Sequence, residues 1–172
     1  NNYYFYSMLS IVIPAHCEED NLPALYQDII SCLPDSLEFE LVMVDDGSPD
    51  LTYTRIEELA AKDERVRGLS ISRNFGHQMA ILAGLNEARG DRVLMMDADG
   101  QHPPSLIMPL MKKLDEGFDI VNTVREDTRD AGYFKKRSSS FFYRFFNALS
   151  DVKIEAASSD FRIMTREAVD AF

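Results

Sequence analysis

The sequence predicts an α/β fold in which a doubly wound, mainly parallel β-sheet carries helices on both faces. Short apolar runs rich in β-branched residues alternate with longer segments in which apolar residues recur every three or four positions. The gaps between the runs are too long for β-hairpins, so a helix can cross over between successive strands. The runs are continuously apolar instead of alternating, which is typical of strands buried on both faces.

Five strands and four helices are expected, and the strands end in polar residues. The strands cover 9–15, 39–46, 67–72, 92–99 and 118–124. The helices cover 21–33, 50–63, 77–88 and 104–117, and in the last of them Leu106, Leu110 and Leu114 share one face. Ligands of such sheets bind beyond the carboxyl ends of the strands, so the polar strand ends predict the functional site.

Composition narrows the classes of function. With 172 residues, 45% of them apolar, the chain can form one compact domain, expected at 8–172 after a non-native or disordered start at 1–7. The net charge of −11 argues against a nucleic-acid backbone as the main partner. Cys17 and Cys32 lack metal-ligand spacing, which predicts free thiols, a reducing compartment and no structural zinc. No apolar run is long enough to span a membrane.

The run "MMDADGQHPP" places Asp97 and Asp99 one residue apart at a strand end. Side chains two apart on a strand share a face, so both carboxylates can converge on one hard cation, with the Gln101 amide oxygen as a further ligand. Without a cation, two like charges would raise one pKa and weaken the fold. We therefore predict a Mg²⁺ or Mn²⁺ site that accompanies a diphosphate ligand, although a DxD triplet alone is weak evidence.

The run "DDGSPD" has two readings. Its residue types favour a turn, and Asp46 and Asp50 would then be turn formers or helix caps. In the functional reading, the Asp45 carboxylate accepts hydrogen bonds from a base or ribose at the sheet edge, and His16 lines the same cleft.

Three further residues close to strand ends could also belong to the site. Arg73 places a cation beside a cleft rich in carboxylates, which suits a diphosphate. His77 and His102 are expected to be solvated or capping residues, not ligands.

The segment "KKRSSSFFYRFFNALS" concentrates basic and aromatic residues in an acidic chain. We predict an interfacial helix that lays Phe and Tyr against a bilayer or lipid tail, with Lys135, Lys136 and Arg137 near headgroup phosphates. The alternatives are packing on a part of the protein outside this chain, or on a partner subunit.

The chain resembles the family 2 glycosyltransferases of the GT-A fold, specifically the polyprenyl-phosphate branch that includes dolichol-phosphate mannosyltransferase and bactoprenol glucosyltransferase. The resemblance covers residues 9–172 and lies in five ordered blocks: "SIVIPAHCEEDNL", "VMVDDGSPD", "SRNFGHQMAILAGL", "GDRVLMMDADGQHPP" and "SSDFRIMTREAV". Five blocks in order are a strong signal, unlike any one of them.

The resemblance implies an inverting transfer of a sugar from a nucleotide-diphosphate donor, UDP favoured over GDP, to a polyprenyl phosphate in cell-envelope glycan or glycolipid synthesis. The donor would be held by Pro14, His16, Glu18, Met43, Asp45, Asp46, Arg73, Asp97, Ala98 and Asp99, and the metal by Asp97, Asp99 and Gln101. Arg125 would contact phosphate, and Asp160 and Arg162 would lie near the acceptor; Asp99, Asp160 and Arg125 are the expected catalytic residues. A lipid phosphate is largely ionised at neutral pH and needs no strong base, whereas a sugar hydroxyl, as in polysaccharide synthesis, would need Asp160 as base.

Some departures from the family pattern limit these implications. Gly100 stands where leucine is common, His16 where relatives have Tyr or Asn, and "SPDLT" replaces "SPDGT". The 135–169 stretch is closer to the glucosyltransferase side. Relatives usually continue into amphipathic and membrane-spanning helices, so the chain is expected to be truncated before them. The full-length protein is expected to be anchored at the inner, cytoplasmic face of the membrane, with homo-oligomerisation open.

Three rival functions remain. A signalling receiver domain also places acidic residues after parallel strands, but a whole strand and helix precede the acidic pair here, and the expected later Thr and Lys are missing. A sugar-phosphate nucleotidyltransferase would carry a basic, glycine-rich loop where this chain has "PAHCEEDNL". An inactive nucleotide-binding scaffold is the third.

Overall fold

The computed structural model of the chain describes residues 8–124 and 158–171. The chain divides into two compact units, Asn1–Val121 with Asp160–Phe172, and Asn122–Ser159. The pocket and the packed cores described below belong to the first unit, whereas residues 122–124 of the fifth strand and 158–159 of the sixth belong to the second. Four residues predicted to bind phosphate or lipid lie outside the described residues: Arg125, Lys135, Lys136 and Arg137. The aromatic segment at 141–146 and the start at 1–7 lie outside them as well.

The described residues contain a six-stranded sheet in the order β3-β2-β1-β4-β6-β5. Its strands are β1 (Leu9–Ala15), β2 (Phe39–Asp45), β3 (Val66–Ser70), β4 (Arg92–Met95), β5 (Ile120–Val124) and β6 (Ser158–Thr165). Strand β1 pairs in parallel with both β2 and β4, and β2 pairs in parallel with β3. The predicted mainly parallel α/β sheet is therefore confirmed.

Two features of the sheet differ from the sequence prediction. Strand β4 ends at Met95 instead of reaching 99, so Asp97 and Asp99 lie on the loop after it. Strand β6 was not predicted, and it pairs antiparallel with β4, Arg92 opposite Thr165. It lies between β4 and β5, so its neighbours are distant in sequence and leave no local signal.

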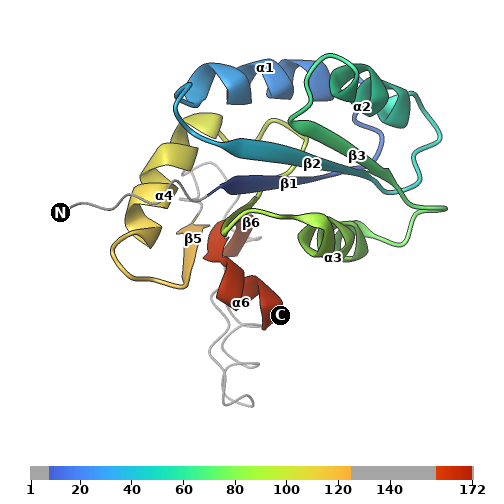
Figure 1. Cartoon of the computed structure of the whole chain (residues 1–172). Helices are drawn as coiled ribbons and strands as arrows, with labels where there is room; N and C mark the ends of the chain where they lie inside the picture. Colours follow the sequence, from blue (N-terminus) through green and yellow to red (C-terminus); the bar gives the residue numbers. More distant parts are fainter. Residues whose placement is uncertain (1–7, 125–157, 172) are drawn as a thin grey trace, which may run out of the picture. The chain divides into compact units, whose positions relative to one another are not determined.

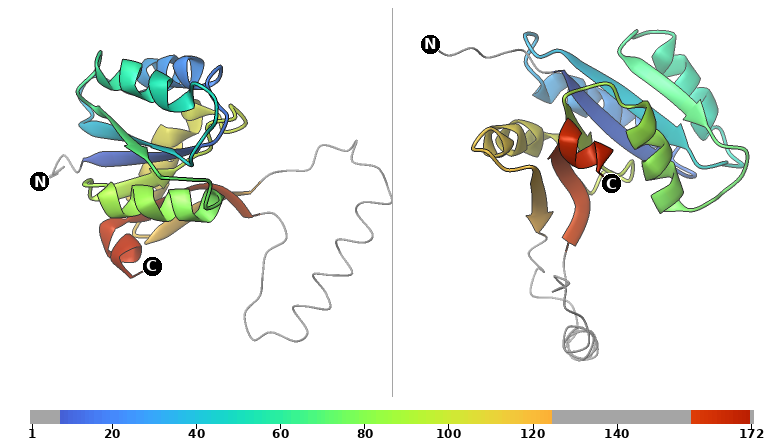
Figure 2. Two further views of the ribbon diagram at one scale, coloured as in Figure 1. Left: turned by 90° about the vertical axis from the view of Figure 1, so that its right-hand side faces the viewer. Right: turned by 60° about the horizontal axis from the view of Figure 1, so that its bottom comes forward.

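Helices cover both faces of the sheet. They are α1 (Leu22–Cys32), α2 (Thr52–Ala60), α3 (His77–Glu87), α4 (Ile107–Leu114), which follows a 3₁₀ turn at Pro104–Leu106, and α6 (Arg166–Asp170). Leu9, Ile11 and Ile13 of β1 pack in a core with α1, α2 and α4, whereas Val12 packs with α3 and α6. Figures 1 and 2 show α1 and α2 on one side of the sheet and α3 on the other. The doubly wound arrangement follows from this alternation along the strands.

The position between β1 and β4 is where the strand order reverses. Pro14 lies in β1, between β2 and β4, although proline is unusual in a central strand. The Met96 amide still donates to the Val12 carbonyl, 3.1 Å away. In a parallel ladder, the residue two positions after Val12 would donate its amide hydrogen to the Met96 carbonyl, but Pro14 has no N–H. The proline therefore ends the ladder between β1 and β4, and the two strands part at the switch point, where ligands of such sheets bind.

The amino ends of the strands are joined by a buried network, which we call the amino-end anchor (Ser10, Glu40, Arg67, Arg89 and Gly90). The Glu40 carboxylate accepts hydrogen bonds from Ser10 Oγ (2.6 Å), the Arg89 amide (2.7 Å) and Arg67 Nη1 (3.1 Å). The Gly90 amide donates to Ser10 Oγ at 2.7 Å. These bonds tie the turn before β4 to the starts of β1, β2 and β3.

No helix within the described ranges is long and apolar enough to cross a membrane.

Candidate active site

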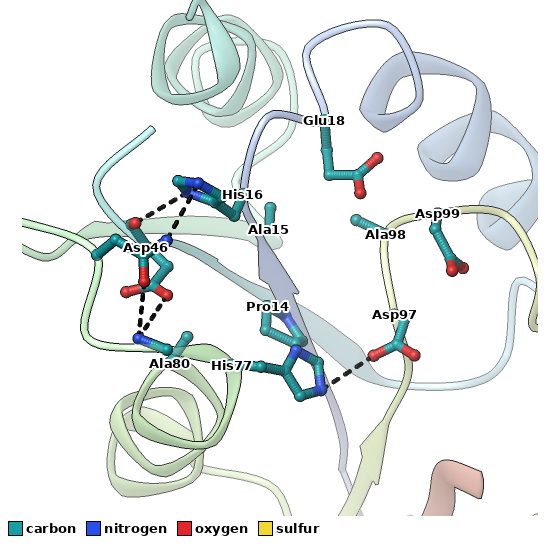
Figure 3. A pocket seen from close by; sticks show the side chains of 12 residues that line it. Pro14, Ala15, His16, Glu18, Asp46, His77, Ala80, Asp97, Ala98 and Asp99 are labelled. Atoms are coloured by element: carbon teal, nitrogen blue, oxygen red, sulfur yellow. Dashed lines mark hydrogen bonds and ion pairs between the residues drawn. The ribbon is translucent and has the colours of Figure 1, made fainter. Parts of the chain in front are cut away.

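A pocket of about 340 Å³ opens at the carboxyl ends of β1, β2 and β4, beside the start of α3 (Figure 3). Its position matches the switch point at which the sequence predicted a ligand. Twelve residues line it: Pro14, Ala15, His16, Glu18, Asp46, Asn74, Gly76, His77, Ala80, Asp97, Ala98 and Asp99.

The loop after β1 brings His16 and Glu18 to the pocket. Cys17 between them has a positive φ of 59°, which turns the chain so that both neighbours reach the same side. His16 Nδ1 lies 3.1 Å from the Asp46 carbonyl oxygen, and the Asn74 side-chain amide lies 3.1 Å from His16 Nε2. A ring that donates at Nδ1 and accepts at Nε2 is a neutral imidazole, so these partners favour that tautomer.

Asp46 is 3% exposed, and its carboxylate holds the loop before α3. It accepts hydrogen bonds from the Phe75 amide (2.8 Å) and the Gly76 amide (2.9 Å). The next residue, Gly47, has a φ of 63°, and a Cβ there would lie 2.4 Å from the Arg73 carbonyl carbon. The two loops therefore pack backbone against backbone, which only glycine permits.

The loop after β4 presents Asp97 and Asp99 to the pocket. Burial raises the pKa of the Asp97 carboxyl above its usual range; the charges of Asp99 and Asp160 act in the same direction, and His102 and His77 act against it. Asp99 Oδ1 accepts a hydrogen bond from the backbone amide of Gln101 at 2.9 Å. Gly100 between them has a φ of 72°, a left-handed conformation that suits glycine better than the leucine common in relatives.

The buried side chain of His102 contacts the backbone of this loop. It is 3% exposed, and its ring stacks on Phe161 of β6 with the centroids 4.9 Å apart. The Asp97 amide donates to His102 Nδ1 at 3.0 Å, so that nitrogen carries a lone pair. Its distance of 3.7 Å from Asp97 Oδ2 therefore provides no hydrogen bond to the carboxylate. The expectation of a solvated or capping His102 is corrected: the side chain is part of the core.

His77 lies between two carboxylates. Its Nε2 is 3.3 Å from Asp97 Oδ1 and 3.4 Å from Asp160 Oδ2. The other Asp160 oxygen, Oδ1, accepts a hydrogen bond from Arg162 Nη2 at 2.9 Å. The His77 side chain is 43% exposed, which agrees with the expectation of a solvated residue. Its contacts with Asp97 and Asp160 were not expected, although its place at the first turn of a helix that starts at the carboxyl edge was an available signal.

Four of the predicted donor or metal residues lie outside the pocket lining. Met43 is fully buried in the core. Asp45 is 2% exposed and accepts hydrogen bonds from the Ser48 amide and Ser70 Oγ. The Arg73 guanidinium lies 4.6 Å from the centre of the Phe75 ring, and Gln101 is exposed. Their predicted contacts with a ligand stay predictions.

The carboxylates fit a divalent cation that is held jointly with a ligand. Among the described residues, no group of three or more His, Cys, Asp or Glu side chains could hold a metal ion by itself. Mg²⁺ is usually bound by one or two carboxylates, with phosphate oxygens and water as the other ligands. Asp97 and Asp99 on one wall of an open pocket match that pattern better than a complete protein cage.

Comparison with known proteins places the chain in a family. Residues 10–172 match the model of glycosyl transferase family 2. The chain is 38% identical over 162 residues to uncharacterized glycosyltransferase YkcC of Bacillus subtilis, covering 94% of this chain and 50% of that protein. It is 38% identical over 163 residues to the bactoprenol glucosyl transferase of Shigella phage SfV, covering 94% and 53%. The chain thus spans about half the length of these curated relatives.

Solved structures agree on the fold. Glucosyl-3-phosphoglycerate synthase from Mycobacterium tuberculosis, crystallised with Mn²⁺, UDP and phosphoglyceric acid, has a TM-score of 0.64 and 25% identity, with 94% of this chain and 56% of that chain covered. Mannosyl-3-phosphoglycerate synthase from Rubrobacter xylanophilus has a TM-score of 0.68 at 22% identity, covering 94% and 54%. The predicted fold class and family are both confirmed: this chain belongs to glycosyl transferase family 2 and has the GT-A fold.

Proposed function

We propose that the pocket is the donor site of an inverting glycosyltransferase that moves a sugar from a UDP-sugar to a polyprenyl phosphate at the cytoplasmic face of a membrane. The observation that carries the proposal is the pair of switch-point carboxylates, Asp97 and Asp99, at a site where the pKa of Asp97 is raised. The names of the bactoprenol relatives support the lipid acceptor, and the UDP in the solved neighbours supports the base.

Asp97 and Asp99, with Gln101 from the same loop, would hold Mg²⁺ or Mn²⁺ against the donor diphosphate. When bound, the cation supplies charge neutralisation for the departing nucleoside diphosphate. His16 and Glu18, from the loop after β1, would contact the nucleoside end of the donor. Pro14 and Ala98 form apolar walls between these two ends.

The surroundings of Asp160 favour an acceptor that is already ionised. Both of its oxygens face nitrogen donors, Arg162 Nη2 on one side and His77 Nε2 on the other. A carboxylate whose two oxygens are already engaged in this way would have to give up a contact before it could take a proton from an acceptor hydroxyl. A phosphate monoester with a second pKa near ~6 has largely lost its proton at neutral pH and needs no strong base.

In the transfer, a phosphate oxygen of the acceptor forms a bond to C1 of the sugar from the face opposite the leaving group. The bond between C1 and the donor diphosphate breaks, and its electron pair leaves with the nucleoside diphosphate. No proton has to be removed from a doubly ionised acceptor. Arg162, whose Nε is buried and has no hydrogen-bond partner among the residues that the structure describes, would add positive charge on the acceptor side. Arg125 and the basic residues at 135–137 remain predicted phosphate contacts.

The donor site is tested by calorimetric titration with UDP and GDP, each with Mn²⁺ and with chelator. We expect metal-dependent UDP binding that is lost in Asp99→Asn and kept in Asp91→Asn. Asp91 is an exposed aspartate just before β4, at the opposite end of that strand, so it provides a matched control. Binding of GDP in place of UDP would mean that the donor nucleotide carries guanine instead of uracil. A lack of metal-dependent binding by both nucleotides would contradict the donor site.

The acceptor is tested in the full-length protein by offering UDP-glucose with undecaprenyl phosphate, and separately with oligosaccharide acceptors. Transfer to the lipid phosphate, slowed only mildly by Asp160→Asn, is the expected result. Transfer only to the sugar hydroxyl, abolished by Asp160→Asn, would instead support the polysaccharide-synthesising alternative with Asp160 as base.

A further inference from the structure

A single side chain joins the donor side of the pocket to the acceptor side. His77 Nε2 contacts Asp97 Oδ1 at 3.3 Å and Asp160 Oδ2 at 3.4 Å. The two carboxylates come from different parts of the fold: Asp97 follows β4, and Asp160 lies in β6. Both are ion-pair distances, longer than a well-formed N–H···O hydrogen bond, and they place the nitrogen between the two carboxylates without a short bond to either.

We propose that His77 is a positioning residue: its Nε2–H bridges the Asp97 and Asp160 carboxylates and sets the separation between donor and acceptor. The inference rests on the proposed function, because it assigns Asp97 to the donor metal and Asp160 to the acceptor side.

The backbone around His77 is held firmly enough for this role. His77 is the first residue of α3, directly after the loop whose Phe75 and Gly76 amides bond to the buried Asp46 carboxylate. The Met79 and Ala80 amides bond back to the Gly76 carbonyl and close the first turn. The imidazole therefore projects from a fixed point toward Asp97, as Figure 3 shows.

The bridge also opposes a repulsion. Asp97 and Asp160 lie on either side of the same imidazole, and their ionised carboxylates repel each other across it. A donor between Asp97 and Asp160 satisfies one oxygen of each and keeps the two from moving apart. If His77 is removed, Asp160 still has its bond to Arg162 and stays at the site. What depends on the bridge is the distance between Asp160 and Asp97.

The bridge requires an N–H at the Nε2 position and does not require a charge. A glutamine side chain carries its amide nitrogen at a similar reach and has two N–H groups, one for each carboxylate. An asparagine amide nitrogen is one bond shorter and corresponds to the Nδ1 position. The bridge therefore predicts rescue by His77→Gln but not by His77→Asn.

The test compares His77→Ala, His77→Asn and His77→Gln in the full-length protein. Transfer from UDP-glucose to undecaprenyl phosphate gives kcat and the acceptor KM, and calorimetry with Mn²⁺ gives the Kd of UDP. We expect kcat to fall roughly 10- to 100-fold in the Ala and Asn variants, because small displacements of reacting groups have effects of that size. His77→Gln should recover most of the loss, and the Kd of UDP should stay within about 3-fold of wild type, since the binding carboxylates remain.

Two controls separate positioning from general damage. Gln78→Ala changes the adjacent exposed residue in the same helical turn and should leave kcat and the melting temperature unchanged. Asp160→Asn alone weakens the bridge and should lower kcat mildly. In that background His77→Ala should add less to the loss than it causes in the wild type, because partners in one network are not additive.

Three results would overturn the bridge: a kcat of His77→Ala within about 2-fold of wild type, a Gln variant no better than Asn, or full additivity with Asp160→Asn. A large loss of UDP binding in His77→Ala would also overturn it, because His77 would then act on the donor directly. If wild type itself neither binds UDP nor transfers sugar, the proposed function fails first; if wild type transfers normally, any failure belongs to the bridge alone.

Discussion

The acidic groups at the two ends of the parallel sheet differ in how their charge is compensated. At the amino end, the single carboxylate of Glu40 receives three hydrogen bonds within the anchor, one of them from an arginine guanidinium. Burial alone would raise the pKa of Glu40, but these bonds outweigh it and hold the pKa below its usual value. At the carboxyl end, burial raises the pKa of the partly exposed Asp97, and the charges of Asp99 and Asp160 act in the same direction.

This difference distinguishes a structural charge from a functional one. A buried charge with all its partners in place stabilises the folded chain and needs nothing further. A cluster of carboxylates with incomplete compensation costs folding free energy, and the cost is removed when a cation binds. Perturbed carboxyl groups at a strand edge are therefore where a ligand is expected, whereas the anchor is expected to act only on stability.

Asp97→Asn is the substitution expected to have the largest effect, and it tests whether the carboxyl-end carboxylates serve function and not stability. Transfer activity should fall on the order of 10²- to 10³-fold, the size seen when one electrostatic stabiliser of a transition state is lost. The melting temperature of the ligand-free chain should stay the same or rise, because a repulsive charge is removed. Mn²⁺ with UDP should raise the melting temperature of wild type and not of the variant. A variant that melts much lower than wild type would make Asp97 a structural residue instead.

At the other end, Glu40→Gln should have the opposite signature. It keeps the shape but removes the charge that accepts bonds from Ser10, Arg67 and the Arg89 amide. The free energy of unfolding should fall by about 2 kcal/mol, as expected for hydrogen bonds to a charged group. Chemical denaturation measures this loss, and UDP affinity at a temperature where the variant is folded should match wild type. A selective loss of UDP binding would contradict the separation of the two ends.

Acid should reduce both effects, with signs that follow from the two shifts. The pKa of Glu40 is lowered from 4.5, so its contribution to stability is present above that value and is lost as pH falls through the lowered pKa. The pKa of Asp97 is raised from 3.8, so its destabilising charge is present above the raised pKa and disappears as pH falls through it toward 3.8. We therefore expect two changes in melting temperature as the pH is lowered from neutral. The gain of Asp97→Asn over wild type should shrink first, and the loss in Glu40→Gln relative to wild type should shrink at a lower pH.

The smallest effect is expected for Asp46→Asn, which lies at the carboxyl end but has structural partners. The asparagine oxygen can still accept from the Phe75 amide, and the Gly76 amide keeps the Asn74 side-chain oxygen, 2.9 Å away. We expect a loss of about 1 kcal/mol in stability, measured by denaturation, and a UDP affinity only a few-fold weaker. A loss of binding as large as that of Asp99→Asn would show that Asp46 contacts the nucleotide directly.

Much of the fold could be predicted from local patterns. The apolar run at 9–15 coincides with β1, and helix α3 begins at His77 as expected. The acidic ends of two runs, with the rule for parallel sheets, identified the edge that holds the pocket. Pro14, His16, Glu18, Asp46, Asp97, Ala98 and Asp99 were all nominated from the sequence, and all of them line it.

The sequence by itself therefore determined the layered α/β architecture, the family and the edge of the sheet at which the site lies, because each depends on residues close together in the chain. Only the tertiary structure decided that β6 inserts beside β4, that His102 is buried against the loop that carries Asp97 and Asp99, and that His77 meets Asp97 and Asp160. It also showed that the Asp46 carboxylate already holds a loop. These contacts join residues far apart in the chain, and their partners are set by packing and strand order, which leave no periodic signal in the sequence.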